Sequence, residues 1–181
     1  MTPPPPIALT IAGSDSGGGA GIQADLKTFH QFGVFGTSVL TAITAQNTVE
    51  VRRVATVDAA LIRAQLDAVA DDLPPAAVKT GMLATTEIVG LVAEAIAARG
   101  WRRYVLDPVM VSTSGHRLLD ADAVAAISER LLPLTALVTP NLDEAELLTG
   151  MTVRDPAAMD EAGRRLVALG AGAALIKGGH L

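Results

Sequence analysis

The sequence of 181 residues contains no cysteine, so neither a disulfide framework nor a thiolate metal site can form within it. The chain also lacks an excess of basic residues, since its formal net charge at pH 7 is −5. A protein whose main partner is nucleic acid needs a basic face for the phosphates. We therefore expect no nucleic acid among its partners.

No long apolar run is present either. A membrane-spanning helix needs about 20 consecutive apolar residues, and no segment approaches that length. Residues 3–6 are all proline with no basic flank, and Asp15 interrupts the apolar stretch that follows, which is not the pattern of a signal peptide. We expect a soluble, cytoplasmic protein that binds no membrane.

Half of the residues are hydrophobic and 18% are charged, which is typical of one compact α/β domain with a filled core. We expect residues 1–6 to be a flexible proline-rich tail and residues 7–181 to be a single domain. Short β-rich runs alternate there with longer segments of helical period. Strands separated by crossover helices run parallel, so the pattern predicts a doubly wound, mainly parallel sheet with helices on both faces.

The expected elements follow one another regularly. Strands are predicted at residues 7–12, 37–45, 77–80, 104–106, 136–139 and 173–176. Helices are predicted at residues 22–31, 58–70, 86–98, 121–131, 142–149 and 156–169. Three residues are suited to cap the beginning of a helix, namely Asp58, Thr85 and Asp120. Four glycines are expected to end helices, namely Gly33, Gly100, Gly150 and Gly170.

The residues that follow the predicted strands are polar or rich in glycine. The segments are GSDSGGGAG from Gly13, AQNT around Gln46, KTGM from Lys79, DPVMVSTSG from Asp107, TPNLDE from Thr139 and KGGH from Lys177. A turn or a helix start explains each fragment equally well when it is taken alone. In a parallel sheet, however, ligands bind beyond the carboxyl ends of the strands. The common location of the segments therefore favours a ligand site.

The first of these segments, residues 13–21, matches neither familiar phosphate-binding signature. Gly17, Gly19 and Gly21 lack the spacing of the dinucleotide fingerprint, and no Lys-Ser or Lys-Thr pair directly follows Gly18 as a P-loop would require. The glycine spacing therefore argues against a dinucleotide-binding oxidoreductase. Asp15 lies inside the loop and Asp25 one helical turn beyond it. These two carboxylates favour a neutral or amine-bearing ligand.

Groups suited to phosphate and magnesium occur later in the chain. Asn141 and Glu144 begin a predicted helix and can hold hydrated magnesium through water, with Asp107 as a second carboxylate. The alternative is a capping box, in which Asn141 is the N-cap and Glu144 is at N3, and both roles can coexist. Lys177 can present its ammonium to phosphate oxygens. The alternative for Lys177 is a solvent-exposed loop lysine.

Six motifs, taken in order, carry a family resemblance: IAGSDSGGGAGIQADLKTF, TAITAQNT, VKTGML, VLDPVMVSTSG, VTPNLDEAELLTG and IKGGH. Together they resemble the hydroxymethylpyrimidine/phosphomethylpyrimidine kinases of the ribokinase-like superfamily, over nearly the whole chain. The resemblance implies a ribokinase-like fold and ATP-dependent phosphorylation of 4-amino-5-hydroxymethyl-2-methylpyrimidine, and then of its monophosphate, in thiamine diphosphate biosynthesis. It also implies a requirement for Mg²⁺, and homodimers are common in the family.

The resemblance further implies roles for single residues. The pyrimidine site is expected to contain Gly13, Asp25, Gln46, Met82 and Val109. Of these, Gln46 is expected to hydrogen-bond the aminopyrimidine edge, and Met82 to pack on the ring. The phosphates of ATP are expected at Asp107, Asn141 and Lys177, and the metal at Glu144 and Asp107 through water.

Full-length members of this family continue beyond the KGGH motif to a Gly-Thr-Gly-Cys segment. Its backbone amides form an anion hole, and its cysteine occupies the position of the catalytic base. The sequence ends at Leu181, so we expect no catalytic base within it and a sheet that is incomplete at the C-terminus. We expect the chain to be the N-terminal portion of a longer kinase, without assured activity of its own. The alternatives are a non-catalytic pyrimidine-binding or regulatory module and a related pyridoxal kinase.

Overall fold

A computed structural model describes residues 3–110 and 121–178 of the chain. Its main sheet has five strands in the order β2-β1-β5-β6-β7, and each neighbouring pair is parallel. The strands are β1 (Ile7–Ala12), β2 (Phe35–Leu40), β5 (Ala77–Thr80), β6 (Tyr104–Leu106) and β7 (Leu137–Val138). The parallel sheet expected from the sequence is confirmed.

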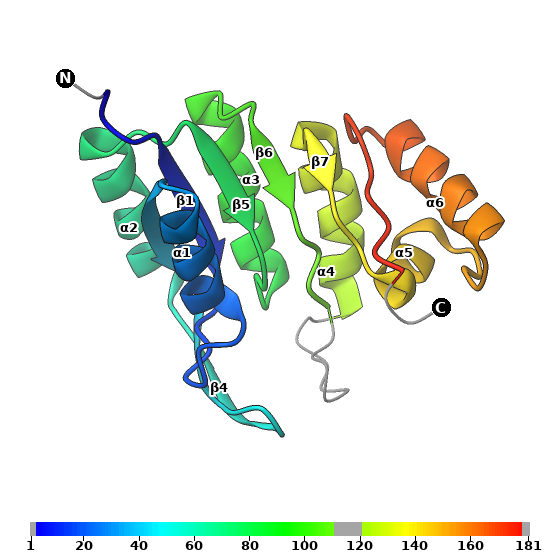
Figure 1. Ribbon diagram of the computed structural model, residues 1–181, viewed down its shortest axis with the longest axis horizontal. Helices are drawn as coiled ribbons and strands as arrows, with labels where there is room; N and C mark the ends of the chain where they lie inside the picture. Colours follow the sequence, from blue (N-terminus) through cyan, green and yellow to red (C-terminus); the bar gives the residue numbers. More distant parts are fainter. Residues whose placement is uncertain (1–2, 111–120, 179–181) are drawn as a thin grey trace.

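Helices cover both faces of this sheet, as predicted. They are α1 (Gly21–Gln31), α2 (Ala59–Asp72), α3 (Thr86–Arg99), α4 (Ala121–Ala126), α5 (Leu142–Thr149) and α6 (Pro156–Ala168). Figure 1 shows α1 on one face, in front of β1, with α2, α3 and α4 behind the sheet. A π-helical turn, Ile127–Leu131, and a 3-10 turn, Leu132–Leu134, continue α4, so the helix predicted at 121–131 is not α-helical throughout.

The predicted helix signals act as expected within the described residues. The side chain of Asp58 accepts a hydrogen bond from Leu61 N, and that of Thr85 accepts one from Ile88 N, so both begin a helix. Gly100 and Gly150 end α3 and α5 in the left-handed conformation, with φ of 63° and 67°. Asp120, the third predicted cap, lies outside the described residues.

The strand predicted at residues 37–45 is two strands in different sheets. β2 ends at Leu40, and β3 (Ala42–Gln46) pairs antiparallel with β4 (Val51–Thr56), which the sequence did not predict. Between them, the hydroxyl of Thr41 donates to Met82 O at 2.6 Å, which anchors the point where the chain leaves the main sheet. β4 is exposed from its second residue onward and lacks the alternation that marks a half-buried strand. The β3–β4 hairpin projects beyond the carboxyl edge of the sheet (Figure 1).

Residues 173–176 do not form the predicted strand. Two isolated parallel bridges occur there, Val138 with Ala174 and Asn141 with Lys177. The neighbouring strand β7 is also shorter than predicted, since only Leu137–Val138 is paired. Residues 173–177 therefore run beside β7 in the parallel direction, as predicted, but form isolated bridges and no regular strand.

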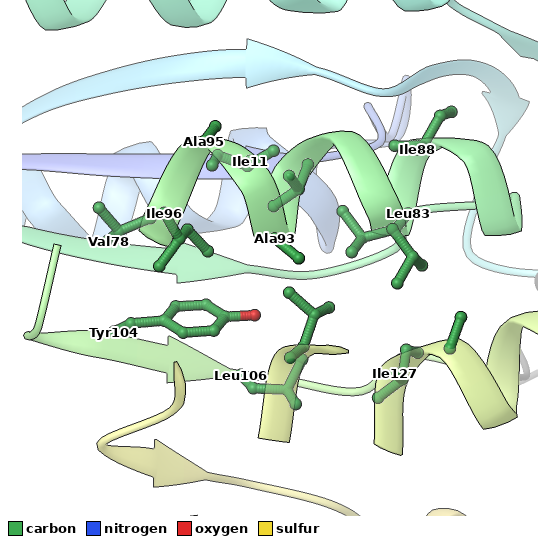
Figure 2. Packing of buried hydrophobic residues seen from close by; sticks show 14 of the residues in the cluster. Ile11, Val78, Leu83, Ile88, Ala93, Ala95, Ile96, Tyr104, Leu106 and Ile127 are labelled. Atoms are coloured by element: carbon green, nitrogen blue, oxygen red, sulfur yellow. The ribbon is translucent and has the colours of Figure 1, made fainter. Parts of the chain in front are cut away.

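The main hydrophobic core lies between the sheet and helices α2, α3 and α4. Figure 2 shows Ile11, Val78 and Leu106 of the strands packed with Ile96 of α3 and with Ile127. A smaller cluster joins α5 and α6 and consists of Leu142, Ala145, Val153 and Ala162. Within residues 3–110 and 121–178, no helix has the length and apolar character needed to cross a bilayer.

Tyr104 is the one aromatic ring among the largest fully buried side chains of the described residues. Its hydroxyl lies 2.7 Å from the hydroxyl oxygen of Thr80 on the neighbouring strand, and burial raises the pKa of the Tyr104 phenol. Tyr104→Phe leaves the buried Thr80 hydroxyl without this partner. We expect a loss of about 1–3 kcal/mol in the free energy of unfolding, measured by urea denaturation.

The double variant Tyr104→Phe/Thr80→Val removes both hydroxyls and leaves neither one orphaned. It is therefore expected to lose less stability than the sum of the two single variants. Additive losses would contradict a direct interaction between these two side chains.

Candidate active site

A cavity of about 300 Å³ lies at the carboxyl edge of the sheet. Its walls come from the loop after β1, from α1, from β3, and from the residues that follow β5 and β6. The five residues predicted for the pyrimidine site all line it, namely Gly13, Asp25, Gln46, Met82 and Val109. The structure thus brings together residues that are up to 96 positions apart in the chain.

The glycine-rich loop at one wall is organised by the carboxylate of Asp15. This carboxylate accepts hydrogen bonds from Gly17 N at 2.8 Å, Gly19 N at 2.9 Å and Ala20 N at 2.8 Å. Asp15 is only 5% exposed. From Asp15 and Asp25 together we expected a neutral or amine-bearing ligand. The loop itself satisfies the charge of Asp15, so this carboxylate does not discriminate between the two kinds of ligand.

Hydroxyl groups of the same loop tie it to β3. Ser16 Oγ donates to Gln46 O at 2.6 Å and accepts from Gln46 N at 2.8 Å. Thr44 Oγ1 donates to Ser14 O at 2.9 Å, and Thr44 N donates to Ser14 Oγ at 3.1 Å. The Ser16 hydroxyl therefore holds both the N–H and the carbonyl group of Gln46, whose side chain lies at the cavity wall.

Two glycines allow close approaches that a larger residue would block. A Cβ atom at Gly13 would overlap the terminal methyl group of Met82, which also lines the cavity. A Cβ atom at Gly21 would overlap the carbonyl oxygen of Gly13, and Gly21 has a positive φ of 57°. That carbonyl accepts from Ile22 N at 3.0 Å, so α1 begins directly against the first turn of the loop.

Four charged side chains of alternating sign extend from the cavity toward β7. Lys79 Nζ lies 2.9 Å from one carboxylate oxygen of Asp25 and 3.7 Å from Asp107, and Lys177 Nζ lies 2.8 Å from Asp107. Thr10 Oγ1 also donates to Asp25 at 2.6 Å. Asp25 is therefore paired within the protein, and it does not discriminate between the neutral and the amine-bearing ligand either. We call these residues, Asp25, Lys79, Asp107 and Lys177, the charge chain.

Of the predicted phosphate-site residues, Asp107 lines the cavity, whereas Asn141 and Lys177 lie beyond β7 and are not among its lining residues. Asn141 and Glu144 form the capping box that was one of the two predicted alternatives: Asn141 Oδ1 accepts from Glu144 N, and Glu144 Oε2 accepts from Asn141 N, each at 2.8 Å. Lys177 N donates to Pro140 O at 2.8 Å, which places Lys177 beside the start of α5. Its side chain is 45% exposed and joins this region to the cavity through Asp107.

The described residues contain no group of three or more acidic or histidine side chains that would enclose a metal ion. Asp107 and Glu144 are the two carboxylates in this region, and the side-chain oxygen of Asn141 is already used by the helix cap. This donor set fits Mg²⁺ that keeps several waters and is held by one or two carboxylates together with phosphate oxygens.

Sequence reasoning missed the importance of Lys79. It lies in the KTGM segment that was noted as a whole, and its ammonium joins the predicted substrate carboxylate Asp25 to the predicted phosphate residue Asp107. A lysine directly within a buried strand was the available signal, since a buried ammonium requires a partner. The loop-to-β3 hydroxyls, Ser16 and Thr44, carried no comparable signal.

Burial raises the pKa of the Glu144 carboxyl, against the lowering effects of the Asn141 backbone N–H and of Lys177. The folded state then holds this proton more tightly than the unfolded state, so the Glu144 contribution to stability falls as pH rises from about 4.5 through the raised pKa. Glu144→Gln keeps the capping box and removes the titration.

We expect the free energy of unfolding of the wild type, relative to Glu144→Gln, to decrease over this pH range in chemical denaturation series. A difference that stays constant or grows with pH would contradict the raised pKa.

Comparison with known proteins supports the motif assignment. The phosphomethylpyrimidine kinase family model matches residues 15–181. The hydroxymethylpyrimidine/phosphomethylpyrimidine kinase of Rhizobium meliloti is 56% identical over 97% of this chain and 66% of its own length. The enzyme of the same name from Synechococcus elongatus is 55% identical over 96% of this chain and 66% of its own length.

Solved structures have the same fold. A crystal structure of phosphomethylpyrimidine kinase from Clostridium difficile matches with a TM-score of 0.91 and 46% identity, over 97% of this chain and 76% of that chain. An ADP complex of pyridoxal kinase from Bacillus subtilis matches with a TM-score of 0.88 and 42% identity, over 97% of this chain and 66% of that chain.

These matches extend over almost the whole sequence, while the chain itself spans 66% of the length of the two curated relatives. The ribokinase-like fold predicted from the sequence is confirmed by its structural neighbours. Since the family model covers far more than half of the chain and the relatives exceed 50% identity, the chain belongs to the phosphomethylpyrimidine kinase family.

Proposed function

We propose that the protein is an ATP-dependent kinase that phosphorylates 4-amino-5-hydroxymethyl-2-methylpyrimidine and then its monophosphate, in thiamine diphosphate biosynthesis. Family membership supports this, as does the name of a relative from Geobacter sulfurreducens, thiamine biosynthesis bifunctional protein, which is 54% identical. The observation that carries the proposal is the single cavity lined by all five predicted pyrimidine-site residues.

The cavity has the size and chemistry for one small ring. Its volume of about 300 Å³ is at the lower end of ligand pockets. The side-chain amide of Gln46 offers both a donor and an acceptor, which complement the amino group and ring nitrogen of an aminopyrimidine. Met82 is 8% exposed and brings a polarisable thioether to the opposite part of the wall. Val109 adds an apolar contact.

The phosphate side of the proposed reaction lies toward β7. Phosphoryl transfer depends mainly on positioning and on neutralising the charge of the phosphates. We propose that Lys177 and the amide nitrogen of Asn141 donate to phosphate oxygens of ATP. Asp107, which lines the cavity, holds the Lys177 ammonium at 2.8 Å. That the catalytic base lies outside this sequence stays a prediction. We assign that role to none of the described residues.

Mg²⁺ is part of the proposal, because kinases of ATP bind it with the phosphates. Glu144 and Asp107 would hold it through water, and when bound it supplies positive charge at the phosphate oxygens. The positive charge of Lys177 acts on both carboxylates, through an ion pair with Asp107 and through its electrostatic effect on Glu144.

The homodimer implied by the resemblance also stays a prediction. Sedimentation velocity measures the oligomeric state and tests it.

Pyridoxal is the second candidate substrate. Structural neighbours named pyridoxal kinase from Bacillus subtilis and Staphylococcus aureus each match with a TM-score of 0.88, at 42% and 36% identity. The Gln46 amide, placed to bind an aminopyrimidine edge, favours the pyrimidine over pyridoxal. The third alternative is a non-catalytic pyrimidine-binding or regulatory module, which would bind the pyrimidine without phosphorylating it.

Isothermal titration of the chain with hydroxymethylpyrimidine and with pyridoxal, followed by an ATP turnover assay on the same sample, tests the proposal. We expect binding of the pyrimidine, with weaker binding of pyridoxal, and magnesium-dependent ADP formation wherever turnover occurs. Preference for pyridoxal would contradict the substrate assignment. Pyrimidine binding with no turnover would favour the binding module.

The variant Gln46→Leu removes the amide and keeps a side chain of similar size. It is expected to weaken pyrimidine binding by about 1–3 kcal/mol, because polar groups of the ligand lose their partner. Gln31→Leu, at the exposed end of α1, is the matched control and should bind as the wild type does. Unchanged affinity of Gln46→Leu would refute the proposed contact.

A further inference from the structure

Lys79 has an unusual position among the charged groups of the cavity. Three carboxylates line the cavity, those of Asp15, Asp25 and Asp107, whereas Lys79 is the one cationic side chain among its described lining residues. Asp15 is already satisfied by three backbone N–H groups of its own loop. Asp107 pairs with Lys177 at 2.8 Å, so the charge that a ligand meets depends mainly on the balance between Lys79 and Asp25.

The geometry makes Lys79 the shared counter-ion of both carboxylates. Its ammonium lies 3.1 and 2.9 Å from the two oxygens of Asp25, and 3.7 Å from Asp107. The side chains of Lys79, Asp25 and Asp107 are each only about a fifth exposed, at 22%, 18% and 22%. Screening by water is weak at such partly buried positions. Because Lys177 pairs with Asp107 at 2.8 Å, loss of the Lys79 ammonium would leave Asp25 as a carboxylate without a counter-ion at the cavity wall.

We propose that Lys79 is a positioning and specificity-determining residue that allows one cavity to accept both a neutral alcohol and its negatively charged phosphate ester. This inference rests on the proposed function and assigns a residue to its second step. The ammonium offsets Asp25 and holds Asp107 toward Lys177, so a phosphorylated ligand is not repelled. A neutral ligand does not depend on this balance to the same extent.

The test compares two dissociation constants for each variant, measured by titration calorimetry at pH 8: that of hydroxymethylpyrimidine and that of its monophosphate. Lys79→Met is expected to weaken binding of the monophosphate at least about tenfold more than binding of the alcohol, because an unbalanced carboxylate repels only the anion. Lys79→Arg keeps the charge and is expected to retain most of the wild-type ratio.

Changes of charge at Asp25 provide a test with the opposite sign. Asp25→Asn removes a negative charge beside Lys79 and is expected to shift the ratio in favour of the monophosphate. The double variant Lys79→Met/Asp25→Asn is expected to return the ratio toward that of the wild type. A contact that both ligands lose equally cancels in this ratio. Arg63→Met removes one positive charge, as Lys79→Met does, but at an exposed position on α2. It is expected to leave the ratio unchanged.

Equal weakening of both ligands by Lys79→Met, with the native circular dichroism spectrum retained, would show a structural role alone and overturn the inference. If Lys79→Met does not fold, the comparison of Asp25→Asn with the double variant decides, and equal ratios in these two would overturn it. A wild-type chain that binds neither ligand contradicts the proposed function itself. A wild-type chain that binds both, with no shift in any variant, contradicts only the role of Lys79.

Discussion

Three backbone N–H groups donate to the buried carboxylate of Asp15, and the arrangement of the cavity depends on the loop shape that results. The shaped loop places Ser14 and Ser16 against β3, and their hydrogen bonds hold the end of that strand. Asp15 therefore helps to fix the backbone of Gln46 at the wall indirectly, by shaping the loop that carries Ser16. A satisfied buried carboxylate is also a poor ligand for a substrate, so Asp15 supports the site without binding in it.

A second constraint is electrostatic. A cavity with several carboxylates in a chain of net charge −5 would exclude phosphates unless cations were placed locally. The charge chain meets this need with alternating signs from Asp25 to Lys177, at separations of 2.8 to 3.7 Å. The residues proposed for the substrate and for the phosphates therefore lie at two ends of one connected network. Under the proposed function, this arrangement would let an acidic protein bind an anionic nucleotide at one edge of its sheet.

Much of the fold could be predicted from the sequence, because local signals and the tertiary structure agree there. Strands 7–12, 77–80 and 104–106 and the helix 142–149 were predicted with their observed bounds. The turn from β2 into the β3–β4 hairpin was missed, since Thr41 acts through a tertiary hydrogen bond and β4 has no apolar alternation. Motif positions placed five residues in one cavity, but no pattern revealed which carboxylates were already paired, because pairing depends on distances between distant segments.

The central claim is that the cavity at the carboxyl edge of the sheet binds the aminopyrimidine ring. A crystal structure of this chain with hydroxymethylpyrimidine measures this most directly. The account predicts the ring between Met82 and Val109, with its amino edge at the Gln46 amide and its hydroxymethyl group directed toward Asp107 and Lys177. Ligand density outside the cavity, or a ring whose amino edge faces away from Gln46, would contradict it.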